Sequence, residues 1–236
     1  MHVFLHATTS DKGDRLTREL KKAGVTALPV DAKFFQTDHR TLRARASDRA
    51  PFLLTASENT LDHIRAIRAA ECASPILVLR ETRDAFASSA VLDAGADDDL
   101  VAPIKMVELL SRINSIARRA AGHSSESITL GEAEIFFDGR HPEFCGHKVP
   151  LSRREYAIFH ELALAGGRCV SKRALYDAVY GMSDDQPFDK VIDVYICKLR
   201  KKFSNASTFD HPYIETVHGR GYKLTEPEFR SVTAAE

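Results

Sequence analysis

Short apolar runs alternate with amphipathic segments over residues 1–119. Each of five candidate strands is followed by a segment with helical periodicity. In the segment after the last strand, Leu110, Ile113 and Ala117 recur at spacings of three and four residues. The candidate strands are Val3–His6, Val25–Val30, Pro51–Thr55, Ile76–Leu79 and Asp99–Ala102. This alternation predicts an α/β fold, a doubly wound (βα)5 domain whose parallel sheet has helices on both faces.

A different pattern begins after residue 119. Residues 120–127 are small and polar without periodic apolar positions, which predicts a linker. Short alternating segments from Ile128 to Val149 then predict a small antiparallel sheet. Helical patterns follow at residues 152 to about 165, 171–180 and 189–203, and two closing strands at 214–217 and 222–224. This order is typical of a winged helix-turn-helix domain, predicted over residues 128–228 and followed by a tail at 229–236.

The first helix of this second domain carries a start signal. Ser152 is a favoured N-cap residue, and Glu155 stands three residues later, at the partner position of a capping box. In such a box each side chain accepts a hydrogen bond from the backbone of the other residue. We therefore expect the helix to begin directly after Ser152.

Length and composition agree with two folded domains. The chain has 236 residues, which is long for a single domain with one hydrophobic core. With 44% hydrophobic and 28% charged residues, its composition is sufficient to form hydrophobic cores. No apolar run approaches the roughly 20 residues that cross a bilayer. The start, Met1–His6, lacks the pattern of a secretion signal. We expect a cytoplasmic protein with no membrane contact.

Candidate catalytic and metal-binding groups are scarce. The four cysteines lie far apart without a Cys-x-x-Cys pair, which argues against a disulfide framework and a thiolate zinc site. The ten histidines show no paired ligand spacing. Nothing resembles a nucleophile triad or a phosphate-cradling glycine loop. We expect no cofactor, no bound metal and no enzymatic activity.

The formal net charge is zero, but the segment from Lys190 to Lys202 has five basic residues and one acidic residue. On a helix, Ile192, Ile196, Leu199 and Phe203 fall on one arc, with Tyr195 at its edge, and predict a buried stripe. The opposite arc combines long cations with smaller side chains, namely Lys190, Val194, Cys197, Lys198 and Lys201.

The outward arc suits the major groove of DNA. Lysine can donate to guanine acceptors, and a valine methyl can contact a thymine methyl. Arg200 and Lys202 fall on the flanks of the helix, where phosphates would lie. An ordinary solvated basic face explains the same residues about equally well when the helix is taken alone.

The closing hairpin adds a second cationic feature. Gly219 and Gly221 permit a tight turn that directs Arg220 outward, with His218 beside it. An outward arginine on a turn suits the minor groove, although a solubilising arginine explains the hairpin alone equally well. Helix and hairpin together, in this order behind a small sheet, favour DNA binding.

The stretches IDVYICKLRKK (192–202) and YIETVHGRGY (213–222) resemble the OmpR/PhoB-type response regulators. Leu151–Ala157 and Val170–Lys172 extend the resemblance over most of residues 128–226. It implies a transcription factor that binds tandem half-sites of double-stranded DNA, with the 189–203 helix in the major groove and the 219–221 turn in the minor groove. The DNA-binding residues expected are Lys190, Val191, Val194, Cys197, Lys198, Arg200, Lys201, Lys202, His218 and Arg220.

Residues 1–119 are similar to a receiver domain in the order of their elements and in the stretches 92–98 and 103–113. The resemblance implies an acidic pair after the first strand to hold Mg²⁺, a phosphorylated aspartate after the third and a lysine after the fifth. Here the first strand ends His6-Ala-Thr8 and the third ends Leu54-Thr-Ala-Ser57. Arg80 stands at the position of the family's hydroxyl residue, and Ala102 at that of its lysine. We expect an atypical receiver that is not phosphorylated by the usual route.

The resemblance implies two protein partners. Family members pair through the receiver, and the residues that match that face are Asp97, Asp98, Glu108, Arg112 and Arg119. Exposed ion pairs would set the register of a homodimer more than its affinity, and unpaired surface charges are the alternative. The loop 181–188 would touch RNA polymerase, although its acids Asp184 and Asp185 are explained equally well by solubility.

Two functions follow from these features. The favoured one is a sequence-specific transcriptional regulator that acts as a phosphorylation-independent homodimer. The alternative is a pseudo-receiver interaction module that sequesters a signalling or polymerase partner, with the winged helix incidental. The outward residues Lys190, Val194, Lys198 and Arg220 favour the first, because an interaction module has no need of them.

Overall fold

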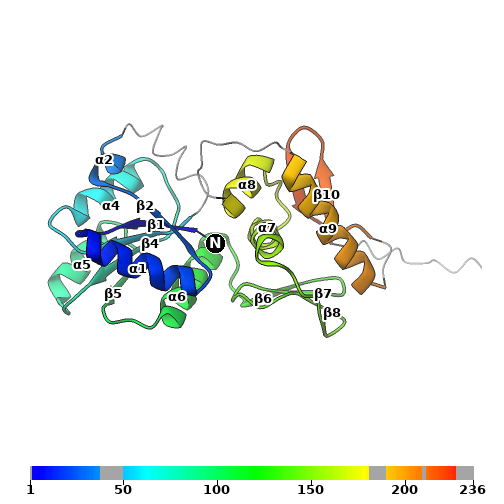
Figure 1. Ribbon diagram of the computed structural model, residues 1–236, viewed down its shortest axis with the longest axis horizontal. Helices are drawn as coiled ribbons and strands as arrows, with labels where there is room; N and C mark the ends of the chain where they lie inside the picture. Colours follow the sequence, from blue (N-terminus) through cyan, green and yellow to red (C-terminus); the bar gives the residue numbers. More distant parts are fainter. Residues whose placement is uncertain (1, 38–49, 181–189, 209–210, 227–236) are drawn as a thin grey trace, which may run out of the picture. The chain divides into compact units, whose positions relative to one another are not determined.

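The computed structural model describes residues 2–37, 50–180, 190–208 and 211–226. The chain divides into two compact units, with the main division between Ser124 and Ser125. Figure 1 shows an α/β unit formed by the first part of the chain and a second unit that ends in a hairpin. Over the described residues, no helix is both long and apolar enough to cross a membrane.

The first unit is built on a parallel five-stranded sheet with the order β2-β1-β3-β4-β5. Its strands are β1 (His2–His6), β2 (Thr26–Pro29), β3 (Phe52–Thr55), β4 (Ile76–Arg80) and β5 (Asp98–Val101). Its helices are α1 (Ser10–Lys22), α2 (Ala32–Phe35), α4 (Thr60–Ala69), α5 (Ala85–Asp93) and α6 (Met106–Ala120). The predicted strand-then-helix alternation is confirmed.

Buried side chains on both faces of the strands explain the two helical layers. On one face, Phe52 and Val78 pack with residues of α2, α4 and α5. On the other face, Leu53 and Leu77 pack with residues of α1 and α6. Because successive residues of a strand point to opposite faces, strands that are apolar at nearly every position need helices on both sides. The predicted doubly wound arrangement is confirmed (Figure 1).

Most strand boundaries of the first unit differ by one residue from those predicted, and two of these differences place a charged residue inside a strand. The sequence predicts that the fourth strand ends at Leu79 and the fifth begins at Asp99, whereas β4 continues through Arg80 and β5 begins at Asp98. The pairing register aligns Leu77 with Asp98 and Arg80 with Val101. An apolar pattern misses such ends, because charged residues are not expected inside a sheet unless they pair.

The second unit begins with an antiparallel sheet of order β6-β7-β8-β9. Its strands are β6 (Ser127–Leu130), β7 (Ala133–Phe136), β8 (Glu143–Phe144) and β9 (His147–Lys148). Helices and an antiparallel hairpin follow as α7 (Arg153–Leu164), α8 (Lys172–Tyr180), α9 (Lys190–Ala206), β10 (Ile214–Val217) and β11 (Gly221–Leu224). This order confirms the predicted winged helix-turn-helix fold.

The predicted capping box is present at the start of α7. The hydroxyl of Ser152 accepts a hydrogen bond from the N–H of Glu155, and the Glu155 carboxylate accepts one of 2.7 Å from the N–H of Ser152. Backbone groups in the first turn of a helix have no partner within the helix, so this exchange fixes where α7 begins. The start of α7 is therefore held in one position next to α9.

Candidate nucleic-acid interface

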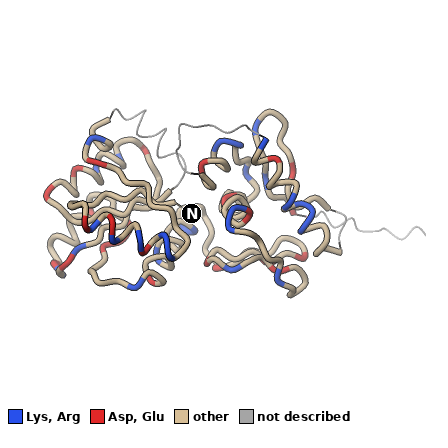
Figure 2. Tube along the Cα trace, viewed as in Figure 1, with Lys and Arg blue, Asp and Glu red and all other residues tan. Residues whose placement is uncertain are grey.

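The exposed face of α9 carries the outward arc predicted from the sequence. Ile192, Ile196, Leu199 and Phe203 are buried, whereas Lys190, Val194, Cys197, Lys198 and Lys201 are exposed. Val191 is half-buried. The Val194 side chain is one of the few large apolar groups open to solvent, at 52% exposure. Basic residues follow the helix (Figure 2). The face therefore combines hydrogen-bond donors with an apolar contact.

Aromatic packing holds α9 in place. The Phe203 ring lies 5.2 Å from the ring of Phe144 on β8 and 5.2 Å from that of Phe159 on α7. Tilted and edge-to-face pairs at this separation add to the stabilisation from burial. The rotation of α9 about its own axis is thus fixed by the core, and its outward face is fixed with it.

The two cations on the flanks of α9 make contacts within the unit. Arg200 donates from Nε to the Ile214 carbonyl and from Nη2 to the Thr216 hydroxyl, both at 2.8 Å. On the other flank, Lys202 Nζ donates to the Pro150 carbonyl at 2.7 Å and to the Glu155 carboxylate at 2.8 Å. These bonds tie α9 to β10 and to the start of α7, and they compete with the phosphate contacts predicted for both cations.

Lys202 also affects the ionisation of Glu155. Burial acts to raise the pKa of this carboxyl group, but hydrogen bonds from Lys202 and from the Ser152 backbone outweigh it and lower the pKa. The carboxylate is therefore charged at neutral pH, and the ion pair between α7 and α9 is maintained.

The hairpin between β10 and β11 presents His218, Gly219 and Arg220 to solvent. The Arg220 N–H donates to the Val217 carbonyl at 3.0 Å and closes the turn. Gly219 has φ of 70°, in the left-handed region that favours glycine. The sequence predicts an outward arginine at this turn, and Arg220 is exposed there.

Gly221 has a second role that the sequence does not reveal. A Cβ atom at this position would lie 1.9 Å from the carbonyl oxygen of Val170. Val170 pairs with Tyr222 through two backbone hydrogen bonds of 2.8 and 2.9 Å. The absence of a side chain at Gly221 therefore lets β11 pair with the segment before α8.

Asp193 links α9 to α8 and to the hairpin. The sequence shows it only as the one acidic residue in a basic segment and does not predict this role. Its carboxylate accepts from Lys172 Nζ at 2.8 Å and from the Tyr222 hydroxyl. These hydrogen bonds, that from Lys172 foremost, lower the pKa of Asp193. Burial, together with Asp193, raises the pKa of Tyr222 to about 12. One carboxylate thus joins α8, α9 and the hairpin.

Comparisons with known proteins agree with this geometry. The sequence profile described as "Transcriptional regulatory protein, C terminal" matches residues 146–224. The cell cycle response regulator CtrA of Brucella ovis is 38% identical over 165 residues, which cover 70% of each chain. The chain belongs to the OmpR/PhoB family of response regulators. This family consists of DNA-binding transcription factors, so the expectation that the chain is not an enzyme is confirmed.

Two solved structures are also similar. DrrB, an OmpR/PhoB homolog of Thermotoga maritima, is 20% identical, with 95% of this chain and 98% of DrrB covered and a TM-score of 0.39. The DNA-binding domain of Klebsiella pneumoniae RstA, in complex with the RstA box, is 31% identical. It covers 42% of this chain and 97% of its own, with a TM-score of 0.36. Family membership rests on the sequence match to CtrA.

The receiver-like unit of this OmpR/PhoB protein has no carboxylate at the described ends of β1 and β3. The residues there are His6-Ala-Thr8 and Thr55-Ala-Ser57, and the Thr8 N–H donates to the Thr55 hydroxyl at 2.8 Å. Mg²⁺ prefers carboxylate and other oxygen ligands. An imidazole and three hydroxyl groups do not fit the magnesium site that the family resemblance implies.

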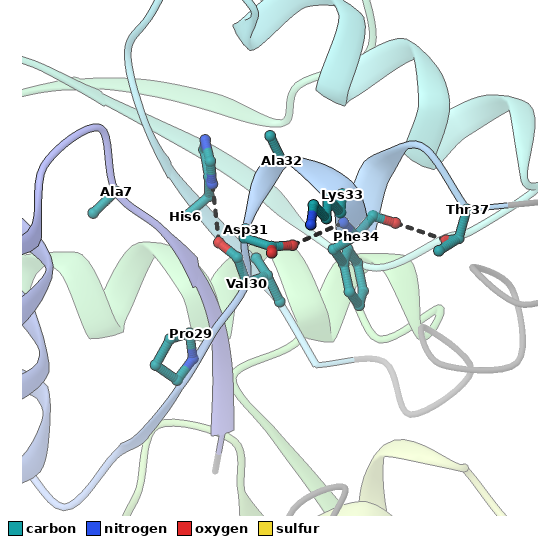
Figure 3. A pocket seen from close by; sticks show the side chains of 9 residues that line it. All are labelled: His6, Ala7, Pro29, Val30, Asp31, Ala32, Lys33, Phe34 and Thr37. Carbon is teal, nitrogen blue, oxygen red and sulfur yellow. Dashed lines mark hydrogen bonds between the residues drawn. The ribbon is translucent and has the colours of Figure 1, made fainter.

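A hollow next to these strand ends is shown in Figure 3. His6 Nδ1 lies 3.0 Å from the Val30 carbonyl oxygen, within hydrogen-bond distance. Asp31 is the one carboxylate among the residues that line the hollow, and it accepts from the Phe34 N–H at 3.1 Å as the N-cap of α2. The imidazole of His6 and the carboxylate of Asp31 are thus engaged in local structure.

A buried ion pair joins β4 and β5. Arg80 Nε donates to the two carboxylate oxygens of Asp99 at 2.9 and 2.7 Å, and the Ser88 hydroxyl of α5 donates to the same carboxylate. The side chains are only 9% and 4% exposed, so solvent screens the pair weakly. This cluster holds β4, β5 and α5 together.

The residues predicted for the dimer face are divided between internal and exposed positions. Asp97 accepts from Arg68 and from the Ile76 N–H, both at 2.7 Å, so it supports its own sheet. Asp98, Glu108 and Arg112 form a surface network, in which Arg112 pairs with Asp98 at 3.1 Å and with Glu108 at 2.8 Å. Arg119 is exposed. Exposed apolar side chains lie on β5 (Val101), on α6 (Val107) and on α5 (Phe86 and Leu92).

Proposed function

We propose that this protein is a sequence-specific transcriptional regulator that acts on tandem half-sites of DNA as a homodimer independent of phosphorylation. One observation carries the proposal: a fixed helix face with exposed cations and Val194 lies in the same unit as a turn that exposes Arg220. A helix in the major groove and an arginine in the adjacent minor groove read base edges and groove width.

The geometry divides the predicted contact residues into two groups. Lys190, Val194 and Lys198 are proposed to face bases, with Cys197 and Lys201 beside them and Val191 at the edge of the contact. Arg220 and His218 are proposed for the minor groove. Arg200 and Lys202 are reassigned to holding α9 against β10 and α7, because their charged groups already bind carbonyl, hydroxyl and carboxylate oxygens.

Phosphorylation independence is supported by the chemistry of the described strand ends. A phosphorylated aspartate after β3 would have to stand among Thr55, Ala56 and Ser57, none of which is a carboxylate. The position of the family's lysine holds Ala102. We propose that the Arg80–Asp99–Ser88 cluster keeps β4, β5 and α5 in one arrangement without a phosphoryl group.

Dimerisation is proposed through the surface of α5, β5 and α6. The network of Asp98, Glu108 and Arg112, with Arg119 beyond it, supplies both signs of charge, and Val101 and Val107 supply apolar area. Both signs on one surface allow it to pair with a second copy across a two-fold axis. Contact of the loop 181–188 with RNA polymerase stays a prediction, because that loop lies outside the described residues.

Selection of bound duplexes from a randomised library by the full chain tests the DNA-binding proposal. We expect enrichment of a motif that occurs twice in the same orientation, with copies about one helical turn, 10–11 base pairs, apart. The unaltered protein should then bind that site about 10³-fold or more tightly than random DNA at physiological salt. Equal affinity for selected and random duplexes would contradict sequence-specific binding.

Incubation with a small phosphodonor and Mg²⁺ tests phosphorylation independence. We expect no stoichiometric acid-stable, base-labile adduct on the N-terminal unit, and no change in the DNA affinity of the full chain. A typical receiver-containing regulator treated in parallel serves as the positive control. Formation of the adduct would contradict this part of the proposal and leave the DNA-binding part intact.

A further inference from the structure

We propose that Arg154, in the first turn of α7, binds a phosphate of the DNA backbone beside the groove that α9 enters. The inference rests on the proposed DNA binding. The new contact comes from α7, whereas the DNA contacts proposed above come from α9 and the hairpin. Arg154 is exposed.

Arg154 is positioned by a residue of α9. Its Nη1 atom donates to the Tyr195 hydroxyl at 3.2 Å. Lys198 Nζ lies 5.6 Å from the centre of the same tyrosine ring. Two cations from different helices therefore converge on one side chain. Tyr195 thereby holds the Arg154 guanidinium beside the cationic face of α9, where the field of both cations favours a nearby anion such as a backbone phosphate.

The contacts on the two flanks of α9 indicate that the anion is a phosphate of the DNA backbone. Lys202 and Tyr195 contact α7 on one flank, through Glu155 and Arg154, whereas Arg200 contacts β10 on the other. A helix with its side chains is about 10–12 Å across and the major groove is about 12 Å wide, so both flanks would face phosphate backbones. The hairpin lies towards one wall of the groove. Arg154 therefore lies towards the opposite wall.

The helix dipole disfavours a cation at the position of Arg154, in the first turn of α7. A cation in the first turn of a helix is opposed by the positive end of the helix dipole. Tyr195 and the start of α7, fixed by the capping box at Ser152, hold the guanidinium on the α9 side. A planar guanidinium can donate to a phosphate while it keeps a bond to a hydroxyl group. We infer that the Arg154 guanidinium is held in position for a phosphate contact before DNA binds.

The test compares Arg154→Gln with Arg153→Gln in the full chain. Both remove one exposed charge from the same helical turn, and the two positions are about 100° apart around the helix. Affinity is measured for a random duplex and for a selected site between 50 and 200 mM salt. We expect R154Q to weaken both duplexes alike, by about fivefold at 50 mM, and to reduce the slope of log K against log salt by about 0.9.

The salt series separates a phosphate contact from a structural effect. Loss of one phosphate contact predicts that the ratio of wild-type to R154Q affinity falls about 3.5-fold between 50 and 200 mM salt. Tyr195→Phe, which keeps the ring but not the hydroxyl, should act in the same direction with a smaller effect. R153Q should leave the slope unchanged.

The possible failures are distinguishable. If the unaltered protein binds no duplex, both the proposed function and this inference are wrong. If it binds, and R154Q keeps the wild-type slope or changes it no more than R153Q does, only the Arg154 contact is wrong. A loss confined to the selected site would also overturn the inference, because a phosphate contact carries no direct sequence information.

Discussion

Gly219 and Gly221 in the hairpin are each required for a different set of structural reasons. Gly219 is required by its backbone angle, with φ of 70°, and open space surrounds the position of a Cβ atom. Gly221, with φ of 149°, is required by contact as well as by its backbone angle, because the Val170 carbonyl oxygen occupies the position of a Cβ atom. The sequence predicts a tight turn from both glycines, but it cannot predict a clash with Val170, which lies far earlier in the chain.

Replacement of each glycine by alanine separates these reasons. Gly219→Ala should cost about 1–2 kcal/mol of stability, the penalty for a left-handed alanine. Gly221→Ala should cost about 3 kcal/mol or more, because the backbone of β11 has to move away from Val170. Thermal unfolding measures both. G221A should also weaken binding to selected DNA, and equal stability of the two variants would contradict the packing explanation.

Lys198 tests base reading at the scale of one side chain. Lys198→Ala should cost about 1–3 kcal/mol of affinity for the selected site and relax the preference at one base position. The affinity of the variant for random duplexes should fall less than its affinity for the selected site. Repeated library selection with the variant measures the relaxed position. The same loss on selected and random DNA would show that Lys198 contacts phosphate instead.

Elements of the first unit are joined by a buried ion pair that is not apparent from the sequence. Arg80 on β4 and Asp99 on β5 pair in the interior, and Ser88 adds α5. Removal of one partner leaves the other charge buried without compensation, which costs more than the pair contributes. The cluster therefore makes the relative position of these three elements sensitive to a single substitution.

Asp99→Asn should destabilise the first unit by about 3–5 kcal/mol. Calorimetric unfolding of the full chain measures the change. Asp62→Asn is a matched control, since it breaks an exposed pair with Arg65 and should cost less than about 1 kcal/mol. The double variant Arg80→Met with Asp99→Leu should recover much of the stability, because no unpaired charge remains.

The pH dependence of the second unit is predicted to follow Glu132, which joins the β6–β7 turn to the residues after α9. Hydrogen bonds from Thr208 and Ser207 lower the pKa of its carboxyl group from 4.5 to about 2. The folded state thus favours the charged form. The resulting stabilisation is fully present above about pH 4.5 and is lost as the pH falls towards 2.

Glu132→Gln should therefore lower the melting temperature most above pH 5. The difference from wild type should shrink between about pH 4.5 and pH 2. Thermal unfolding over this pH range measures it. Glu143→Gln, on β8 of the same sheet, is a control that should show no such change. A difference that grows on acidification would contradict the assignment.

At the scale of the whole molecule, the fold was predictable because each unit repeats its pattern. The alternation of strands and helices and the buried arc of α9 follow from apolar periodicity, and Ser152 and Glu155 mark the start of α7. The engagement of Arg200, Lys202 and Asp97 was not predictable. Each bonds to residues distant in sequence, which periodicity does not locate.

The proposed dimer is a prediction about the whole molecule. Val107 is 72% exposed at the start of α6, beside Glu108. Val107→Glu should place unpaired charge in the interface and weaken dimerisation about tenfold or more. Sedimentation of the full chain over a concentration series measures this. Arg18→Glu, on the exposed side of α1, should leave the dimer unchanged. A monomeric unaltered protein at every concentration would contradict the dimer.

The backbone pairing of Val170 with Tyr222 has a consequence for the DNA sequences that this protein can accept. Together with the hydrogen bonds from Arg200 to β10 and from Tyr222 to Asp193, it holds the Arg220 turn at a fixed distance from α9. One base pair inserted between the two contacted stretches would displace one of them by about 3.4 Å along the duplex. Such operators should therefore be rejected unless the DNA itself bends.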